Sequence, residues 1–129
     1  MSLDQHQALV RRAIEAFNAQ DLGAAVDVCT GNVRGQLQQH LDTMPWVDYR
    51  VEITELIAEG DRVVAVISTE GLHAATYHGI PPTGQRFTNQ GVVIFRVEGG
   101  RLSEMESYVD SLGVVTQLGG SVLPRPPGS

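Results

Sequence analysis

The stretch that decides the fold is WVDYRVEITELIAEGDRVVAVISTEGLH, residues 46–73. Before the tripeptide EGD at residues 59–61, and again after it, apolar and polar residues alternate with a period of two. Successive side chains of a β-strand point to opposite faces, so this alternation is typical of a strand with one buried face. Because a glycine-containing turn separates the two runs, the stretch predicts a pair of antiparallel strands.

Two further strands are predicted downstream. QRFTNQGVVIFRV (85–97) and RLSEMESYVD (101–110) are separated by EGG (98–100), which we interpret as a three-residue hairpin loop. Four strands joined in sequence by short connections indicate an antiparallel meander. The loop TYHGIPPTGQRF (76–87) connects the second strand to the third. We expect a type I turn there, with Pro82 second and Gly84 fourth; the loop is then either a rigid rim of a cavity or a plain connector.

The residues before Trp46 show helical spacing instead. An apolar stripe recurs at three- and four-residue intervals, and Ser2 with Gln5 forms a capping-box pattern at its start. A second short helix is predicted behind Asp21 and a third behind Asn32, each as N-cap, with Pro45 ending the third. The stripe of the first helix consists of Leu3, Val10, Ala13, Ile14 and Phe17.

Helices that precede an antiparallel sheet are typical of the α+β class. We expect a cone-like fold in which the N-terminal helices pack in a curved antiparallel β-sheet and leave an internal pocket. The length suits a single domain over residues 1–120, and the Gly- and Pro-rich residues 121–129 are predicted to form a flexible C-terminal tail.

Composition and charge exclude several classes of partner. The chain has 129 residues, nine Lys plus Arg, and a net charge of −6, which argues against nucleic acid and anionic membranes. Its single cysteine, Cys29, excludes an internal disulfide, and its four histidines lack the spacing of a metal motif. The start of the chain is polar where a signal peptide would be apolar, and no apolar run is long enough to span a membrane. We therefore expect a cytoplasmic protein without a metal.

Strand parity singles out Asp110 as a candidate catalytic acid/base. If residue 97 faces residue 101, one face of the sheet holds Gln90, Val92, Glu106, Tyr108 and Asp110. This mixture of polar, ionisable and aromatic groups is unusual for a core and reasonable for a cavity. A carboxylate in an apolar pocket is a stronger base than one in water and can remove a proton from carbon beside a carbonyl. The alternative is that Asp110 caps the turn at residues 111–113.

The remaining candidates share the predicted cavity. His73 ends the second strand and could donate to a developing oxyanion or relay a proton, although a histidine in a strand can equally be a hydrogen-bonded structural residue. The other candidates also have alternative roles: they could be ion-paired or could simply form part of the hydrophobic core. The expected substrate-binding residues are Tyr108, Glu106, Tyr77, Gln90, Tyr49 and Trp46.

The sequence from Met44 to Gly119 resembles the SnoaL-like polyketide cyclases, also called predicted ester cyclases, of the nuclear-transport-factor-like superfamily. The resemblance rests on G-x-H at residues 71–73, G-x-x-PTG at residues 79–84, and an aromatic-Arg strand end at residues 95–96. It continues with the glycine turn, Leu102, Glu104, Asp110 and QLG at residues 117–119. The resemblance implies an α+β cone that dimerises through the outer face of its sheet, with Asp110 as acid/base and His73 as the pocket histidine.

The implied activity is a small cofactor-independent cyclase that acts on a polyketide or similar apolar carbonyl compound by aspartate acid/base, aldol-type chemistry. Such an enzyme is of the lyase or isomerase type, works as a homodimer and binds an apolar small molecule. The chain departs from the family pattern at Val66 and Glu106, so two alternatives stay open. One is a related hydroxylase, epoxide-opening, isomerase or polyene-cyclising enzyme; the other is a non-catalytic ligand-binding or dimerisation module.

Overall fold

The four strands form one antiparallel sheet in sequence order, β1-β2-β3-β4, as the meander predicts. The structure is a computed structural model that describes residues 2–120; the predicted tail over residues 121–129 lies outside the described residues. In chain order the elements are α1 (Leu3–Asn18), the 3₁₀ helix η1 (Leu22–Ala25), α2 (Gly31–Thr43), β1 (Trp46–Glu59), β2 (Arg62–His73), β3 (Arg86–Glu98), β4 (Arg101–Val109) and α3 (Ser111–Gln117).

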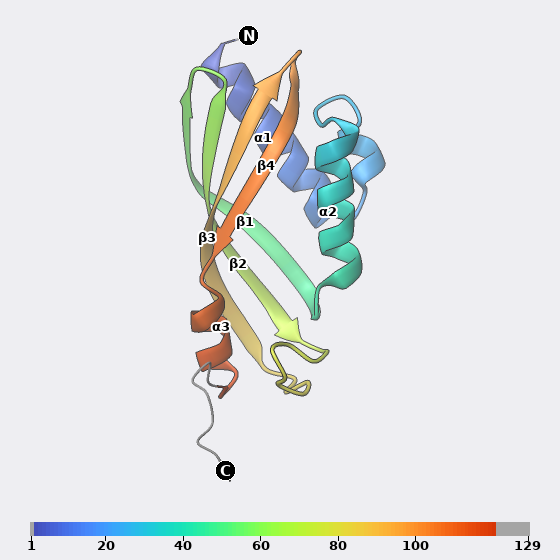
Figure 1. Ribbon diagram of the computed structural model, residues 1–129, viewed down its shortest axis with the longest axis vertical. Helices are drawn as coiled ribbons and strands as arrows, with labels where there is room; N and C mark the ends of the chain where they lie inside the picture. The colour runs from blue at the N-terminus through green and yellow to red at the C-terminus, as the bar shows by residue number, and fades with distance from the viewer. Residues whose placement is uncertain (1, 121–129) are drawn as a thin grey trace.

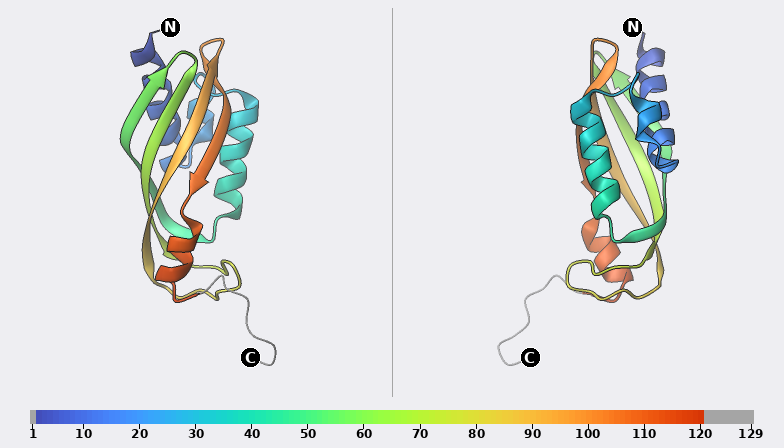
Figure 2. Two further views of the ribbon diagram at one scale, coloured as in Figure 1. Left: turned by 60° about the vertical axis from the view of Figure 1, so that its left-hand side comes forward. Right: turned by 90° about the vertical axis from the view of Figure 1, so that its right-hand side faces the viewer.

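Both long helices cover the same face of the sheet. α1 and α2 lie side by side across its concave face, and α3 continues from the lower end of β4 (Figures 1 and 2). The buried face alternates as period-two patterning requires: in β2 it consists of Val63, Ala65, Ile67, Thr69, Gly71 and His73. The fold is therefore the predicted α+β class with helices packed in a curved sheet.

The helix ends follow local capping chemistry. Ser2 and Gln5 form the predicted capping box of α1. The second helix does start behind Asp21, which is the N-cap residue of η1 but makes no capping hydrogen bond there; the third prediction is wrong, because α2 starts behind Thr30 rather than Asn32. Asn32 instead donates its amide to the carbonyl of Ser103 over 3.3 Å, a contact that joins α2 to β4 and cannot be read from local sequence.

The pairing of β3 with β4 differs from the predicted register. Glu98 pairs with Arg101, so the hairpin loop has two residues, and both of its glycines have positive φ (58° and 77°), as a type I′ turn requires. The register then shifts between Arg96 and Val97, because Ser103 is an extra residue in β4. This bulge puts Leu102 in the core but turns Glu104 to the outer face.

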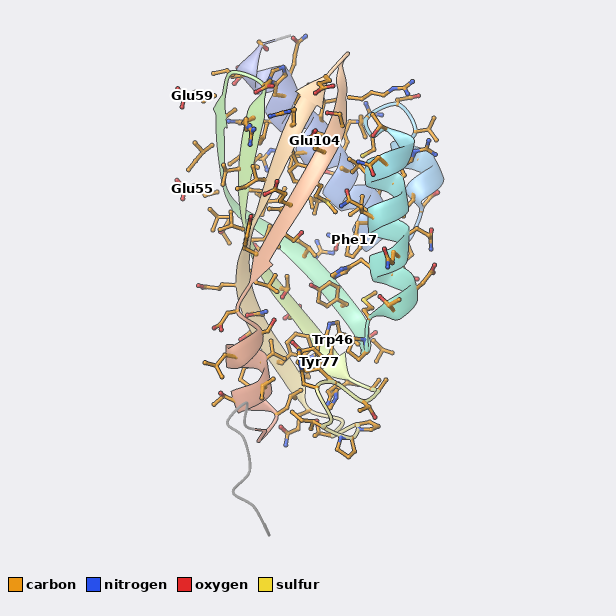
Figure 3. All side chains as sticks on the ribbon, viewed as in Figure 1. Phe17, Trp46, Glu55, Glu59, Tyr77 and Glu104 are labelled. Carbon is orange, nitrogen blue, oxygen red and sulfur yellow. The ribbon has the colours of Figure 1, made fainter. Side chains whose placement is uncertain are left out.

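The proline loop reverses direction earlier than predicted. Tyr77 and Ile80 exchange backbone hydrogen bonds of 3.0 and 2.9 Å, and the two residues between them, His78 and Gly79, have φ of 48° and 77°. These features define a tight turn of the type I′ kind at His78–Gly79 rather than a type I turn at residues 81–84. The two ends of the sheet carry different side chains. Glu55 and Glu59 lie toward the β1–β2 turn, and Trp46 and Tyr77 lie near the proline loop (Figure 3).

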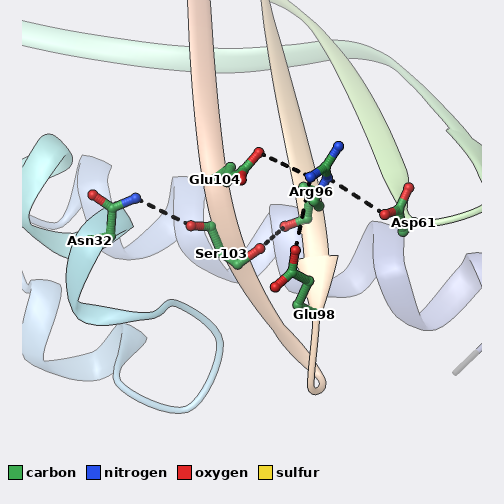
Figure 4. A network of polar contacts seen from close by, with 6 residues as sticks. All are labelled: Asn32, Asp61, Arg96, Glu98, Ser103 and Glu104. Atoms are coloured by element: carbon green, nitrogen blue, oxygen red, sulfur yellow. Dashed lines mark hydrogen bonds and ion pairs between the residues drawn. The ribbon is translucent and has the colours of Figure 1, made fainter.

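An ion-pair cluster ties the strands together on the outer face. The Arg96 guanidinium lies 3.5 Å from Asp61, 4.0 Å from Glu98 and 3.6 Å from Glu104 (Figure 4). Because these carboxylates are solvent-exposed, each ion pair contributes at most about 1 kcal/mol to the stability of the fold. We interpret the cluster as structural.

Candidate active site

A cavity of about 300 Å³ opens between the carboxyl end of α2, the start of β1, the proline loop and the start of α3. This volume is at the lower end of the range of small-molecule pockets, which is roughly 300–1,000 Å³. The wall combines four aromatic side chains with six other side chains that can form hydrogen bonds. The aromatic residues are Trp46, Tyr49, Tyr77 and Phe87, and the polar ones used below are His40, Thr69, Asn89 and Ser111.

Three of the aromatic rings form one contiguous surface. The centroid of Trp46 lies 4.3 Å from that of Phe87 and 4.7 Å from that of Tyr77. Rings at these separations pack favourably, so the surface is rigid. Gly71 makes room for it, because a Cβ at this position would stand 3.1 Å from Phe87 and 3.2 Å from Tyr49. A planar apolar ligand would find a preformed wall here.

A smaller chamber of about 60 Å³ lies deeper, between α1, α2 and the sheet. Its lining is almost wholly apolar and includes Phe17, Leu37 and Met105. His40 and Tyr49, together with Val109, line both spaces, so the inner chamber adjoins the outer cavity at these side chains.

His40 and Tyr49 are the ionisable groups at this junction. Desolvation lowers the pKa of the His40 imidazole, which favours its neutral form at pH 7. Burial raises the pKa of Tyr49, and the interaction of its hydroxyl with the Thr69 side chain partly opposes this rise. The junction therefore combines a neutral imidazole with a protonated phenol, which are a proton acceptor and a hydrogen-bond donor.

Asp110 does not lie in the apolar cavity, contrary to one expectation, and the alternative expectation that it caps residues 111–113 is confirmed. Its side chain is exposed, and its Oδ1 accepts the backbone N–H of Gly113 over 2.9 Å as the N-cap of α3. It lines a separate polar pocket of about 240 Å³ with Gln90 and Gln117. Among the described residues, no carboxylate lines the outer cavity or the inner chamber. The predicted catalytic role of Asp110 stays a prediction.

Three predicted substrate-binding residues lie on the wrong face for the cavity. Gln90, Glu106 and Tyr108 do share one face, but it is the outer one, where the Tyr108 hydroxyl donates to Glu106 over 2.9 Å and Tyr108 is 59% exposed. For Glu106 and Tyr108 the bulge at Ser103 is the reason, because it reverses the parity of β4 relative to Leu102; Gln90 lies in β3 and pairs with Ser68 on the outer face of β2. Tyr49, Trp46 and Tyr77 do line the cavity. Whether these three contact a substrate stays a prediction.

His73 is fully buried behind the aromatic wall, 5.8 Å from Trp46 between ring centroids. Its Nδ1 accepts the backbone N–H of Thr83 over 3.1 Å, and the Thr83 hydroxyl lies 2.9 Å from the same nitrogen. His73 does not line the cavity and instead fastens the proline loop whose Tyr77 and His78 do. Its predicted role as a catalytic assistant stays a prediction.

Several cavity residues were not predicted, among them His40, Thr69 and His78. His40 lies one turn beyond the buried Leu37 on α2, so its place on the inward face was readable from helical spacing. Thr69 lies on the buried face of β2, two residues before Gly71. His78 reaches the cavity only because of the tight turn after Tyr77, for which sequence parity gave no signal.

The structure is a small single-sheet α+β cone with a partly open cavity that four aromatic side chains help to line. TsrD from Streptomyces laurentii has this fold, with a TM-score of 0.79 at 22% identity over 94% of this chain and 99% of that one. A SnoaL-like polyketide cyclase from Agrobacterium tumefaciens also has it, with a TM-score of 0.72 at 16% identity over 87% of this chain and 96% of that one. At these identities the likeness shows the fold.

Sequence comparison gives the family. The model of the SnoaL-like polyketide cyclases matches residues 7–118, and the chain belongs to this family. The aklanonic acid methyl ester cyclase DnrD of Streptomyces peucetius is 27% identical over 132 residues, which cover 86% of this chain and 88% of the relative. The nogalonic acid methyl ester cyclase of Streptomyces nogalater is 30% identical over 70 residues, 54% of this chain and 52% of the relative. The chain is thus an enzyme of the cyclase type.

Two further features bear on the partners of the site. Within residues 2–120, no helix has the length and apolar character needed to cross a membrane. In the same part of the chain, no three His, Cys, Asp or Glu side chains converge as metal ligands do.

Proposed function

We propose that this enzyme closes a ring in an apolar carbonyl compound of the polyketide class, with the substrate held in the aromatic cavity beneath α2. The observation that carries the proposal is the lining of that cavity, where a rigid aromatic wall faces a few hydrogen-bonding groups. Such a surface holds a conjugated, mostly apolar compound by stacking and orients its carbonyls by hydrogen bonds. The names of two relatives support a polyketide methyl ester as the substrate class.

The proposed reaction is an intramolecular aldol addition. A base removes a proton from a carbon beside a carbonyl group, and the resulting enolate carbon forms a bond to a second carbonyl carbon. The new alkoxide then takes up a proton. No atom leaves and no electron is transferred to another molecule, so the product is an isomer of the substrate and the step requires no cofactor.

Asp110 is one candidate for the acid/base, on the family resemblance of its position. Its two chain neighbours, Val109 and Ser111, both line the cavity, which puts its backbone at the rim. To act there, the carboxylate has to leave the N–H of Gly113 and turn toward Asn89, the residue that lines both the cavity and the pocket of Asp110. In this proposal His73 assists by holding the proline loop in place.

The outer face of the sheet supports the proposal of a homodimer. Val64, Val66, Val92 and Ile94 are only half-buried there, and the exposed Tyr108 lies beside Val92. Covering such a strip with a second copy would remove apolar surface from water. Sedimentation velocity of wild type and of Val66→Glu tests this, because a charge in the strip should convert a dimer into a monomer.

The test of the activity uses aklanonic acid methyl ester as the probe. We expect the purified enzyme to convert it, without added metal or cofactor, into a product of identical mass that chromatography resolves. Trp46→Ala removes the centre of the aromatic wall, so its KM for the probe should rise by a factor of about 10 or more. Glu59→Gln, an exposed change at the opposite end of the sheet, is the matched control. If the wild type neither binds nor converts the probe, this function is wrong for that substrate class.

A further inference from the structure

The outer cavity and the inner chamber share three lining residues, His40, Tyr49 and Val109, of which His40 and Tyr49 are ionisable. From this position we propose that His40 is the catalytic base of the ring closure and that Tyr49 donates a hydrogen bond to the enolate oxygen. The inference rests on the proposed function and deepens it, because it assigns the proton transfer to side chains that line the cavity.

The packing of α2 aims the imidazole into the cavity. Val33 and Leu37 are buried on the inward face of the helix, and His40 follows Leu37 at the helical interval of three residues. The imidazole centroid lies 5.9 Å from that of Phe17 on α1 and 6.4 Å from that of Tyr49 on β1. These rings pack near the imidazole, and His40, which is solvent-exposed, also lines the cavity.

The surroundings leave the ring nitrogens available for a substrate. Desolvation is the sole cause of the lowered pKa of His40, with no hydrogen bond or charged neighbour contributing. The side chains that line the inner chamber with it come from α1, α2 and all four strands, and they include Phe17, Tyr49 and Met105. Tyr49 is the only titratable one among them, and it is uncharged at neutral pH. A neutral imidazole without a competing partner is a good general base near neutral pH.

Tyr49 is set up to donate rather than to accept. In the proposed step the phenolic hydrogen bonds the substrate oxygen, and the Thr69 hydroxyl, which interacts with the phenol, can donate to the phenolic oxygen at the same time. The raised pKa of Tyr49 keeps that hydrogen in place throughout the working pH range. A positioned donor at a developing enolate oxygen stabilises the charge that forms in the transition state.

The alternatives to His40 are few within the described residues. No carboxylate lines either space, and Tyr77 and His78 line the outer cavity without reaching the inner chamber. The proposed step is therefore as follows. An unprotonated nitrogen of His40 takes the α-proton, the C–H electron pair becomes the enolate, and that enolate forms the new carbon–carbon bond. The imidazolium then returns the proton to the alkoxide, which restores neutral His40.

The experiment measures kcat/KM for aklanonic acid methyl ester from about pH 5 to about pH 9 in wild type and His40→Gln. In the wild type we expect an acid limb below the ordinary histidine value of about 6.5, since the base must be unprotonated. His40→Gln should lose about 10²- to 10⁴-fold in kcat and lose that acid limb, while the probe still binds. Deuterium exchange into the probe from heavy water isolates the proton-removal step and should fall in parallel.

Two further variants keep the outcome interpretable. Gln39→Ala, an exposed change beside His40 on α2, should retain the rate and the pH profile of the wild type. His78→Gln should retain the acid limb whatever its effect on KM. Wild-type turnover with an unchanged limb in His40→Gln overturns this inference alone, and a loss confined to Asp110→Asn assigns the base to Asp110 instead. Absence of wild-type turnover overturns the proposed function and this inference with it.

Discussion

Thr83 donates its backbone N–H to Nδ1 of His73 over 3.1 Å, and its hydroxyl lies 2.9 Å from the same nitrogen. An N–H can only donate, so Nδ1 is the acceptor and the ring hydrogen of a neutral His73 is on Nε2. Two backbone bonds reinforce the pair: His73 donates to the Gln85 carbonyl over 2.9 Å, and Gly84 donates to the His73 carbonyl over 3.0 Å. The G-x-H and PTG motifs therefore bind to each other and hold the two ends of the proline loop together. We call this set of hydrogen bonds between His73 and residues 83–85 the latch.

Thr83→Val tests the latch. It removes the hydroxyl and keeps the backbone N–H, so we expect the free energy of unfolding to fall by about 1 kcal/mol. Amide hydrogen exchange at Gly84 should quicken, because the loop opens locally more often. Urea denaturation and exchange monitored by NMR provide the two measurements. Thr88→Val is the control, since the Thr88 hydroxyl makes no hydrogen bond within residues 2–120. Unchanged exchange at Gly84 in Thr83→Val would show that the loop is held by other contacts.

A second prediction separates the two roles of Asp110. Asp110→Ala should reduce the free energy of unfolding by about 1 kcal/mol, since the N-cap of α3 loses its acceptor. Asp110→Asn should change stability little, because asparagine caps as well as aspartate does. Any loss of turnover in Asp110→Asn at unchanged thermal stability then reports acid/base chemistry. If both variants keep full activity, Asp110 serves as a cap alone.

How far the sequence predicted this molecule depends on whether the deciding interaction is local. Period-two alternation from Trp46 onward predicted the strands and their order, because a strand with one buried face has alternating apolar and polar residues. The outward direction of Glu106 and Tyr108 was not predictable, because one bulge at Ser103 reverses every later side chain of β4. No local pattern signals that bulge.

α3 illustrates a further limit. In the sequence, QLG at residues 117–119 is part of the family resemblance. In the structure, its glutamine makes a tertiary contact. The Gln117 side chain donates to the Thr88 carbonyl over 2.7 Å and accepts the Thr88 N–H over 3.0 Å, as a neighbouring strand would do. The helix is thereby fixed beside β3, which places Val114 in the wall of the cavity. A side chain that replaces a backbone partner across 29 residues of sequence cannot be recognised from spacing.

Gly71→Ala is predicted to distort the aromatic wall. The added Cβ would stand 3.1 Å from Phe87 and 3.2 Å from Tyr49, closer than ordinary contact, so one of the two rings has to shift. Overpacking of this kind costs about 1–3 kcal/mol. Since Tyr49 borders the cavity, we also expect weaker binding of the probe, measurable as a raised KM. Gly60→Ala is not a suitable control, because Gly60 has a positive φ of 57°. Gly35→Ala, on an open helical surface, is the better one and should stabilise the protein slightly.

The pH dependence of stability gives the last prediction. Burial lowers the pKa of His40 in the folded state, so between that value and the ordinary one of about 6.5 the unfolded chain binds more protons than the folded one. Stability therefore rises with pH across this window and is lost as pH falls through it. His40→Gln removes this contribution, so the fall in melting temperature from about pH 7 to about pH 5 should be shallower than in the wild type. Gln39→Ala should follow the wild type. Parallel curves for wild type and His40→Gln would mean that the His40 ring is hydrated in the folded protein, and the case for a neutral base in the cavity would lose its electrostatic support.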